Sequence, residues 1–237
     1  MPTLVENAAV PSGTSSTAVR RLGRMGYHEA RELQRELVGA RRAGAVPDTL
    51  LLLEHPPVIT LGRSGTPDHL LGTGAELADR GVAFVETDRG GDITFHGPGQ
   101  IVGYAIVDLD PRGRDLHRYL RDLESVLIRA LDELGIRAGR VAGLTGVWVG
   151  DAKVGAIGIR VSRWITHHGF ALNVDTDLSY FDLIVPCGIT DRRVTSIERL
   201  LGRPLDRDAV EAGLARAFED VFGAAPSPTA EPRETLR

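Results

Sequence analysis

The sequence predicts an α+β fold in which helices pack on a mixed or antiparallel sheet. Three stretches repeat apolar residues every three or four positions, which is the spacing of an amphipathic helix. Short strand-like runs lie between them, and within residues 145–174 these runs follow one another directly. A parallel connection needs a crossover of about a dozen residues, so these neighbouring strands must be antiparallel.

Helices are expected within residues 27–44, 115–135 and 206–223. The second has a wide apolar stripe that suits burial against a sheet, with Asp115 placed as an N-cap and Gly135 as a stop. We expect all three helices to be structural.

Strands are expected at residues 50–54, 58–61, 82–86, 92–96, 100–107, 146–149, 152–161 and 164–174. Gly150 and Asp151 give a two-residue hairpin signal, and a second reversal is expected near Ser162 and Arg163.

Residues 1–17 and 224–237 are rich in Ser, Thr, Pro and Ala. Such segments bury too little apolar surface to offset the entropy of ordering, so we expect two flexible tails. No linker or internal repeat interrupts the chain between them, which predicts a single domain at residues 18–223.

The composition argues against several classes of protein. The 237-residue chain has 28 basic and 32 acidic residues and a net charge of -4, so no nucleic-acid partner is expected. Its apolar runs are shorter than the roughly 18–20 residues of a membrane span, and its N-terminus lacks the pattern of a signal peptide. The single cysteine cannot form an internal disulfide, so a cytoplasmic location is expected.

The densest group of glycines and polar residues is RGGDITFHGPGQ, residues 89–100. Its four glycines indicate sharp backbone turns on both sides of a short strand. Two turns around an edge strand would explain the glycines but not Arg89, Thr94, His96 and Gln100. The alternative is a backbone that approaches a ligand closely, although no dinucleotide-binding or P-loop motif is present.

A lysine begins the strand-like segment KVGAIGIR, residues 153–160. Strict alternation would place Lys153 on the same face as Ile157, Ile159 and Val161, which is an unusual setting for a charged side chain. The lysine either extends to water from the end of the strand or is partly desolvated.

Two histidines open the segment HHGFALNV, residues 167–174. Consecutive strand residues point to opposite sides, so His167 and His168 are not expected to bind one metal ion unless the strand is bulged. Small residues at Gly169 and Ala171 share one face, which suggests room for a slender apolar chain.

The only cysteine, Cys187, lies between Pro186 and Gly188, in a loop and not in a regular element. A lone thiol is often a small buried hydrophobic group. The alternative is a nucleophile, which needs a neighbouring base or cation. The candidates by residue type are Lys153, His96, His167 and His168.

In their order and spacing, RGGDITFHGPGQ, KVGAIGIR, HHGFALNV and VPCGI resemble the octanoyltransferase family of lipoate biosynthesis, over about residues 20–222. The resemblance implies a fold like the catalytic domains of biotin and lipoate protein ligases, with residues 18–223 as a single catalytic acyltransferase domain. It implies that Cys187 takes an octanoyl group from acyl carrier protein as a thioester, and that Lys153 is the second catalytic residue. The residues that match the family's substrate-contacting segments are Arg89, Gly90, Gly91, Asp92, Ile93, Thr94, Phe95, His96, Ala156, Ile157, Gly158, Gly169, Phe170 and Ala171.

The same resemblance implies the partners. The acceptors would be lysines in the lipoyl domains of 2-oxoacid dehydrogenase complexes and in the glycine cleavage H protein. No metal and no other cofactor would be needed, because the acyl group arrives already activated.

Three other functions stay open at this point. An ATP-dependent lipoate or biotin ligase of the same fold would need no cysteine. A cysteine thioesterase would pair Cys187 with His96 or His168. A non-enzymatic module would bind acylated proteins without forming a covalent adduct.

Overall fold

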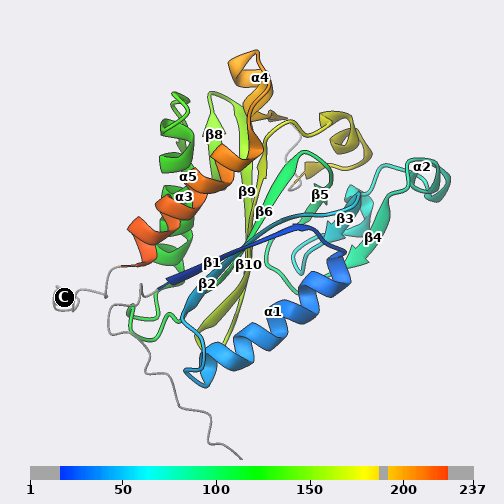
Figure 1. The fold of residues 1–237 in the computed structure, drawn as a ribbon. Coiled ribbons are helices and arrows are strands. Elements are labelled where there is room, and N and C mark those ends of the chain that lie inside the picture. Colours follow the sequence, from blue (N-terminus) through cyan, green and yellow to red (C-terminus); the bar gives the residue numbers. More distant parts are fainter. Residues whose placement is uncertain (1–16, 187–191, 224–237) are drawn as a thin grey trace, which may run out of the picture.

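A computed structural model describes residues 17–186 and 192–223 of the chain (Figure 1). The strand order in its main sheet is β1-β2-β6-β10-β9-β8-β7, and β11 pairs with β9. These strands are β1 (Thr17–Arg24), β2 (Asp48–Glu54), β6 (Gln100–Ile106), β7 (Gly139–Val141), β8 (Leu144–Val149), β9 (Ala152–Ser162), β10 (Ile165–Asn173) and β11 (Arg193–Val194). The pairs from β2 to β7 are antiparallel, whereas β1 and β11 join the sheet in parallel.

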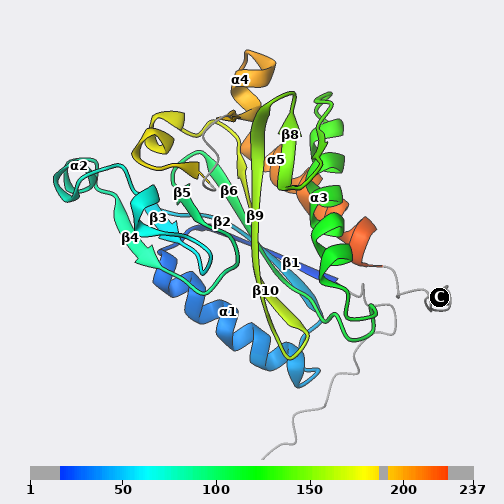
Figure 2. The same ribbon diagram turned by 180° about the vertical axis from the view of Figure 1, so that it is seen from behind.

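A smaller sheet has the order β4-β3-β5. It consists of β3 (Val58–Leu61), β4 (Ala83–Glu86) and β5 (Ile93–His96). The helices are α1 (Tyr27–Arg42), α2 (Gly74–Asp79), α3 (Leu116–Asp132), α4 (Ile197–Leu201) and α5 (Arg207–Phe222), with 3-10 helices η1 (Pro67–His69) and η2 (Leu178–Leu183). Figure 2 shows the long strand β9 between the small sheet on one side and α3 on the other.

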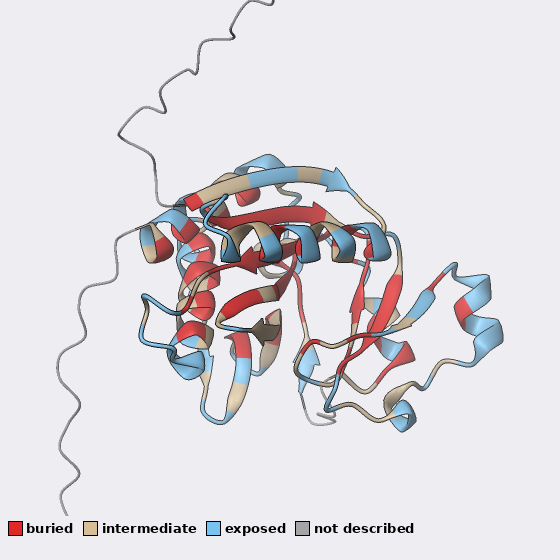
Figure 3. Ribbon diagram, turned by 90° about the horizontal axis from the view of Figure 1, so that it is seen from below, coloured by how far each residue is buried: buried red, intermediate tan, exposed pale blue. Residues whose placement is uncertain are grey.

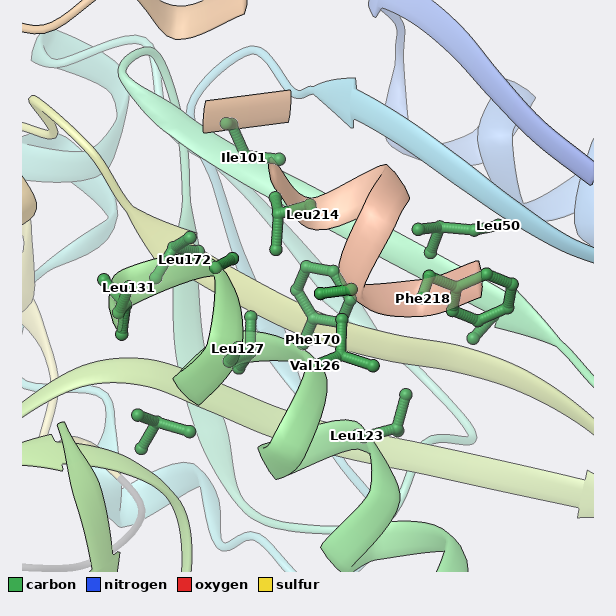
Figure 4. Close-up of a cluster of buried hydrophobic side chains, with 14 of the residues drawn as sticks. Leu50, Ile101, Leu123, Val126, Leu127, Leu131, Phe170, Leu172, Leu214 and Phe218 are labelled. Atoms are coloured by element: carbon green, nitrogen blue, oxygen red, sulfur yellow. The ribbon is translucent and has the colours of Figure 1, made fainter. Parts of the chain in front are cut away.

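Apolar side chains hold helices on both faces of the main sheet. Helices α3 and α5 cover one face, where Leu127, Leu214 and Phe218 pack against Phe170 and Leu172 of β10 (Figure 4). Helix α1 covers the other face, over β2, β6 and β10. Buried residues are concentrated in the strands and on the sides of the helices turned toward them (Figure 3). Burial of this apolar surface is the main force that holds the layers together.

The small sheet lies on the same side of the main sheet as α1, beside the first turn of the helix. The hydroxyl of Tyr27 donates a hydrogen bond to Oγ1 of Thr87 at 2.9 Å, which joins α1 to the segment after β4. The small sheet has its own core with η2, in which Phe95 stacks on Tyr180 with ring centroids 4.6 Å apart.

The predicted α+β class is confirmed, and the three predicted helices and all predicted strands are present with bounds within about two or three residues. Strands β1, β7 and β11 and the short helices α2 and α4 were not predicted. β1 has two adjacent arginines and a mostly half-exposed pattern, so its sequence lacks a clear alternation. Thr17, assigned to the N-terminal tail, is buried and pairs with Asp48; the rest of both predicted tails lies outside the described residues.

None of the helices in residues 17–186 and 192–223 combines the length and the apolar character that crossing a bilayer demands.

Candidate active site

A narrow cavity, called the central cavity below, lies where the segment of residues 89–96 meets the middle of β9 and β10. Its wall consists of Tyr27, Arg89, Gly91, Asp92, Ile93, Thr94, His96, Val102, Tyr104, Ala156, Ile157, Gly158, His168, Gly169, Phe170 and Ala171. The three segments predicted to contact a ligand therefore come together around one space.

Glycines allow the two sheets to approach closely at this point. The Gly90 N–H donates to the carbonyl oxygen of Ile159 at 2.7 Å, so residues 89–91 lie directly on β9. A Cβ at Gly158 would be 2.9 Å from the carbonyl oxygen of Gly90, which leaves no room for a side chain. Gly91 has a φ of +85°, a conformation that other residues rarely adopt. The glycines thus allow two parts of the protein to approach closely, and the predicted approach of this backbone to a ligand stays a prediction.

All but two of the predicted substrate-contacting residues line the central cavity. Gly90 borders a neighbouring groove, together with Ser64 and Leu144. Phe95 points away from the cavity into the core of the small sheet, because alternate residues of β5 face opposite sides.

Several wall residues were not predicted. Tyr27 begins α1, Val102 and Tyr104 lie in β6, and His168 was considered only as a partner for the cysteine or a metal. β6 begins with Gln100, but its other residues are apolar or glycine, and every residue in it is buried. A strand buried on both faces gives no signal of which face borders a cavity.

Two buried histidines at the central cavity are neutral: His96 belongs to its wall, and His55 lies behind the wall. The Nδ1–H of His55 donates to the carbonyl oxygen of Met25 at 2.7 Å, and its Nε2 accepts a hydrogen bond from the Tyr104 hydroxyl at 2.7 Å. Desolvation by burial lowers the pKa of His55 to about 4 and the pKa of His96 to about 3. Both rings therefore serve as hydrogen-bonding groups at neutral pH and not as cations.

A chain of hydrogen bonds, first between side chains and then through the backbone of Thr195, leads from the central cavity to the backbone of Lys153. His96 Nδ1 donates to Oε1 of Gln100 at 2.8 Å, and Nε2 of Gln100 donates to Oδ1 of Asn173 at 2.8 Å. Nδ2 of Asn173 donates to the carbonyl oxygen of Thr195 at 3.0 Å. The N–H of Thr195 in turn donates to the carbonyl oxygen of Lys153 at 2.9 Å. Gln100, which the sequence left unexplained, is thus a connecting residue.

Arg89 brings a buried cation to the wall. Its Nη2 donates to the carbonyl oxygen of Thr60 at 2.7 Å and to Oγ1 of Thr60 at 2.8 Å, and its Nη1 donates to the Gly90 carbonyl oxygen at 3.1 Å. The guanidinium thereby fixes the loop of residues 89–91 to β3.

The prediction that Lys153 shares a face with Ile157, Ile159 and Val161 is wrong. The register between β8 and β9 shifts: Val147 pairs with Gly155, but the next residue, Trp148, pairs with Lys153. The extra residue in β9 is a β-bulge, which turns the strand over locally. Lys153 therefore lies on the side of the central cavity, with its Nζ 4.8 Å from the centre of the Trp148 ring.

Lys153 is 8% exposed and borders a second, smaller cavity next to the central one. This second cavity shares Thr94, Ala156 and Ala171 with the central cavity, and its wall also includes Pro186. Cys187, the residue after Pro186, lies outside the described residues. The structure therefore does not test the predicted pairing of Cys187 with Lys153.

Both flanks of the undescribed segment are held in place. On the N-terminal side, the Val185 N–H donates to the carbonyl oxygen of His69 at 2.8 Å. His69 Nδ1 in turn lies 2.5 Å from Oδ2 of Asp92, a wall residue of the central cavity. On the C-terminal side, Val194 of β11 pairs in parallel with Lys153 itself.

The expectation that His167 and His168 point to opposite sides is also wrong. His168 has a φ of +59°, in the left-handed region, and this reversal brings the two rings to 5.0 Å between centroids. Both rings face Asp88: Nε2 of His168 is 3.1 Å from Oδ1, and Nε2 of His167 is 3.5 Å from Oδ2.

Comparison with known proteins places the chain in a family. Residues 26–219 match the model of the lipoyl protein ligase A/B catalytic domain. The chain is 56% identical to an octanoyltransferase of Rubrobacter xylanophilus over 208 residues, covering 86% of this chain and 93% of that protein. It is 53% identical to an octanoyltransferase of Chloroflexus aurantiacus, covering 88% of this chain and 95% of the relative.

Solved structures agree on the fold. A putative lipoate protein ligase from T. acidophilum with bound lipoic acid matches with a TM-score of 0.69 at 16% identity, covering 86% of this chain and 85% of the other. A biotin protein ligase from Aquifex aeolicus in complex with biotin and ATP matches with a TM-score of 0.53 at 16% identity, covering 86% of this chain and 70% of the other. The predicted ligase-like fold and the resemblance to octanoyltransferases are both confirmed. The chain belongs to the lipoyl protein ligase A/B catalytic domain family, and within that family to the octanoyltransferases.

Proposed function

We propose that this octanoyltransferase works through a thioester on Cys187, with Lys153 as the general base and the octanoyl chain in the central cavity. The donor is the octanoyl thioester of acyl carrier protein. The acceptors are lysines of lipoyl domains in 2-oxoacid dehydrogenase complexes and of the glycine cleavage H protein.

The observation that carries this proposal is the shared cavity wall of Lys153 and Pro186. Cys187 follows Pro186 directly in the chain, and Val194, shortly after it, pairs with Lys153. The second cavity borders the central cavity and shares Thr94, Ala156 and Ala171 with its wall. An acyl chain in the central cavity would thus have its reactive end on the side of Lys153.

The first half-reaction exchanges one thioester for another. Lys153 accepts the proton of the Cys187 thiol, and the sulfur attacks the carbonyl carbon of the donor. A new C–S bond forms, the C–S bond to the carrier breaks, and the carrier sulfur leaves with the proton that Lys153 returns. The exchange is nearly balanced in energy, so it requires a good nucleophile and leaving group, and a thiolate is both.

The second half-reaction forms an amide. The acceptor lysine loses a proton to Lys153 and attacks the acyl carbon, and Cys187 leaves and recovers the proton. This step is downhill, because an amide is more stable than a thioester. Backbone N–H groups near the glycine-rich segments would supply donors for the developing oxyanion.

Intact-mass measurement of the protein mixed with octanoyl carrier protein, without ATP and without acceptor, tests the proposal. We expect the mass of one octanoyl group on the wild-type chain, mapped to Cys187, and none on Cys187→Ala. Adding a lipoyl domain should then discharge the adduct onto its lysine. Transfer that depends on ATP and Mg²⁺ would indicate a ligase, and free octanoate formed at a rate unaffected by the acceptor would indicate a hydrolase.

A further inference from the structure

We propose that Asp88, His167 and His168 form a binding site for one divalent transition-metal ion, with zinc as the preferred ion. Each residue offers one ligand atom, and the three atoms lie within 4.8 Å of one another. Two imidazole nitrogens and one carboxylate are a donor set that zinc uses in proteins, with a fourth position open to water.

The two nitrogen-to-oxygen distances in this cluster suit a tetrahedral ion, whereas the two ring nitrogens, which lie within 4.8 Å of each other, would have to approach each other on binding if they stand farther apart than the ligands of such an ion. The two nitrogen-to-oxygen distances are 3.1 Å and 3.5 Å. Zinc binds nitrogen at about 2.0–2.1 Å and oxygen at about 2.0–2.2 Å, so the ligand atoms of a tetrahedral site lie about 3.3–3.5 Å apart. An ion could therefore enter between the carboxylate and the rings with small side-chain movements.

The backbone holds the two rings on one side in an uncommon conformation. Without the φ of +59° at His168, consecutive residues of β10 would point in opposite directions. Left-handed backbone is unfavourable for a residue other than glycine, and such strain gathers at functional sites. The conformation is fixed by the His168 N–H, which donates to Oε1 of Gln34 on α1 at 2.7 Å.

The charges of the cluster also suit a cation. Desolvation by burial lowers the pKa of His167 and takes that of His168 to about 4, so both rings are neutral at pH 7, the form that binds metals. Burial acts to raise the pKa of Asp88, but its contacts with His168 and His167 outweigh this and take the pKa to about 2. An ion bound through the two Nε2 atoms requires each neutral ring to carry its proton on Nδ1. Arg160 and Arg35, which act on His167, oppose a further positive charge, so we expect weaker binding than at thiolate sites.

The cluster can be reached from solvent, and the His167 ring in it can move. The Asp88 side chain is 40% exposed, whereas the His167 and His168 side chains are 15% and 3% exposed. Nδ1 of His167 has no hydrogen-bond partner in the described part of the chain, so its ring can shift toward an ion without breaking a second bond.

A bound ion would join two parts of the central cavity wall. His168 lies in that wall, and Asp88 precedes Arg89, the first residue of the segment that covers it. The ion would thus tie β10 to the start of the glycine-rich segment. Because it binds only the folded arrangement, it should also raise the unfolding temperature.

Isothermal titration of the chelator-treated full-length chain with ZnCl₂ tests the proposal. The chain should carry no histidine tag and should carry Cys187→Ala, so that the thiol cannot bind the metal. We expect one zinc ion per chain, a higher unfolding temperature with zinc, and a visible absorption spectrum of four- or five-coordinate Co²⁺ that zinc abolishes. Failure of both ions to bind would overturn the proposal.

Variants locate the ion. His167→Ala and Asp88→Asn should each weaken zinc binding by roughly tenfold or more. His117→Ala, which removes an exposed histidine in the first turn of α3, is the matched control and should leave the affinity unchanged. Zinc affinity that survives both cluster variants, with folding checked by circular dichroism, would overturn the proposal. If one variant fails to fold, the other and the Co²⁺ spectrum of the parent chain decide.

Discussion

The close contact between residues 89–91 and β9 can be tested by replacing Gly158 with alanine. The added Cβ would lie 2.9 Å from the carbonyl oxygen of Gly90 and 3.2 Å from Cδ of Arg89, so the loop would have to move. Overpacking of this kind costs about 1–3 kcal/mol, and stretching the 2.7 Å hydrogen bond from Gly90 to Ile159 adds up to about 1 kcal/mol. We therefore expect the free energy of unfolding to fall by about 2 kcal/mol. Because the loop forms the cavity wall, kcat/KM for octanoyl transfer should fall roughly tenfold or more.

The assay combines urea denaturation with transfer of octanoate from carrier protein to a lipoyl domain. Gly39→Ala on α1 is the matched control, because its new Cβ would meet nothing within 4 Å and its backbone is helical. That substitution should stabilise the protein by up to about 1 kcal/mol and leave transfer unchanged. The reasoning is refuted if Gly158→Ala unfolds at the wild-type urea concentration and retains full kcat/KM.

Three further predictions concern the groups around the site. Lys153→Ala should lower kcat by about 10²–10⁴-fold and leave the midpoint of urea denaturation unchanged. Lys153→Arg should be nearly as inactive, because a guanidinium stays protonated and cannot accept a proton. An active arginine variant would show that Lys153 acts through its charge and not as a base. His55 has a pKa near 6.5 when unfolded but about 4 when folded, so it contributes about 3 kcal/mol of stability that is present above pH 6.5 and is lost as the pH falls from 6.5 to 4. His55→Gln should flatten this acid limb in urea titrations, and an unchanged slope would contradict the pKa shift. Glu124→Gln weakens the charged hydrogen bonds of this side chain with Arg140 at 2.7 Å and with the Gly146 N–H at 3.1 Å, so the free energy of unfolding should fall by about 2 kcal/mol. Because Gly146 lies against the Lys153 side chain, kcat should fall as well. A wild-type kcat would show that this contact does not position the lysine.

The sequence predicts the elements that have strong periodicity. The stripe of α3 and the hairpins of residues 145–174 follow from spacing alone, because helix and strand periods differ and short reversals allow only antiparallel pairing. β1 was missed because it joins the sheet at an edge, where half its residues need not be apolar. Its place depends on parallel pairing with β2, which is a tertiary contact that no local pattern encodes.

The site residues were predicted from clustered glycines, a lysine in a strand and a single cysteine. The errors came from backbone irregularities. The positions of Lys153 and His168 were both derived from strict alternation. A bulge in β9 moved the first to the cavity side, and a left-handed residue moved the second. Neither the bulge nor the left-handed residue has a glycine at the position where the backbone departs from a regular strand, so no local sequence signal indicates it. Tyr27 and Tyr104 were missed because they are wall residues contributed by elements whose sequence reads as ordinary core.

The hydrogen bonds and pKa values of the buried histidines bear on whether the acyl group is transferred or hydrolysed. A cysteine hydrolase with His96 or His168 as its base needs a basic ring nitrogen free to take the thiol proton. His96 Nδ1 donates to Gln100, and burial lowers the pKa of the ring to about 3, so its other nitrogen is a poor base. His168 is held by Asp88, and its pKa is about 4. Lys153, by contrast, shares a cavity wall with Pro186. In the proposed mechanism, Lys153 would serve an incoming lysine as well as it serves the thiol, and exclusion of water from the narrow cavity would favour transfer to lysine over hydrolysis.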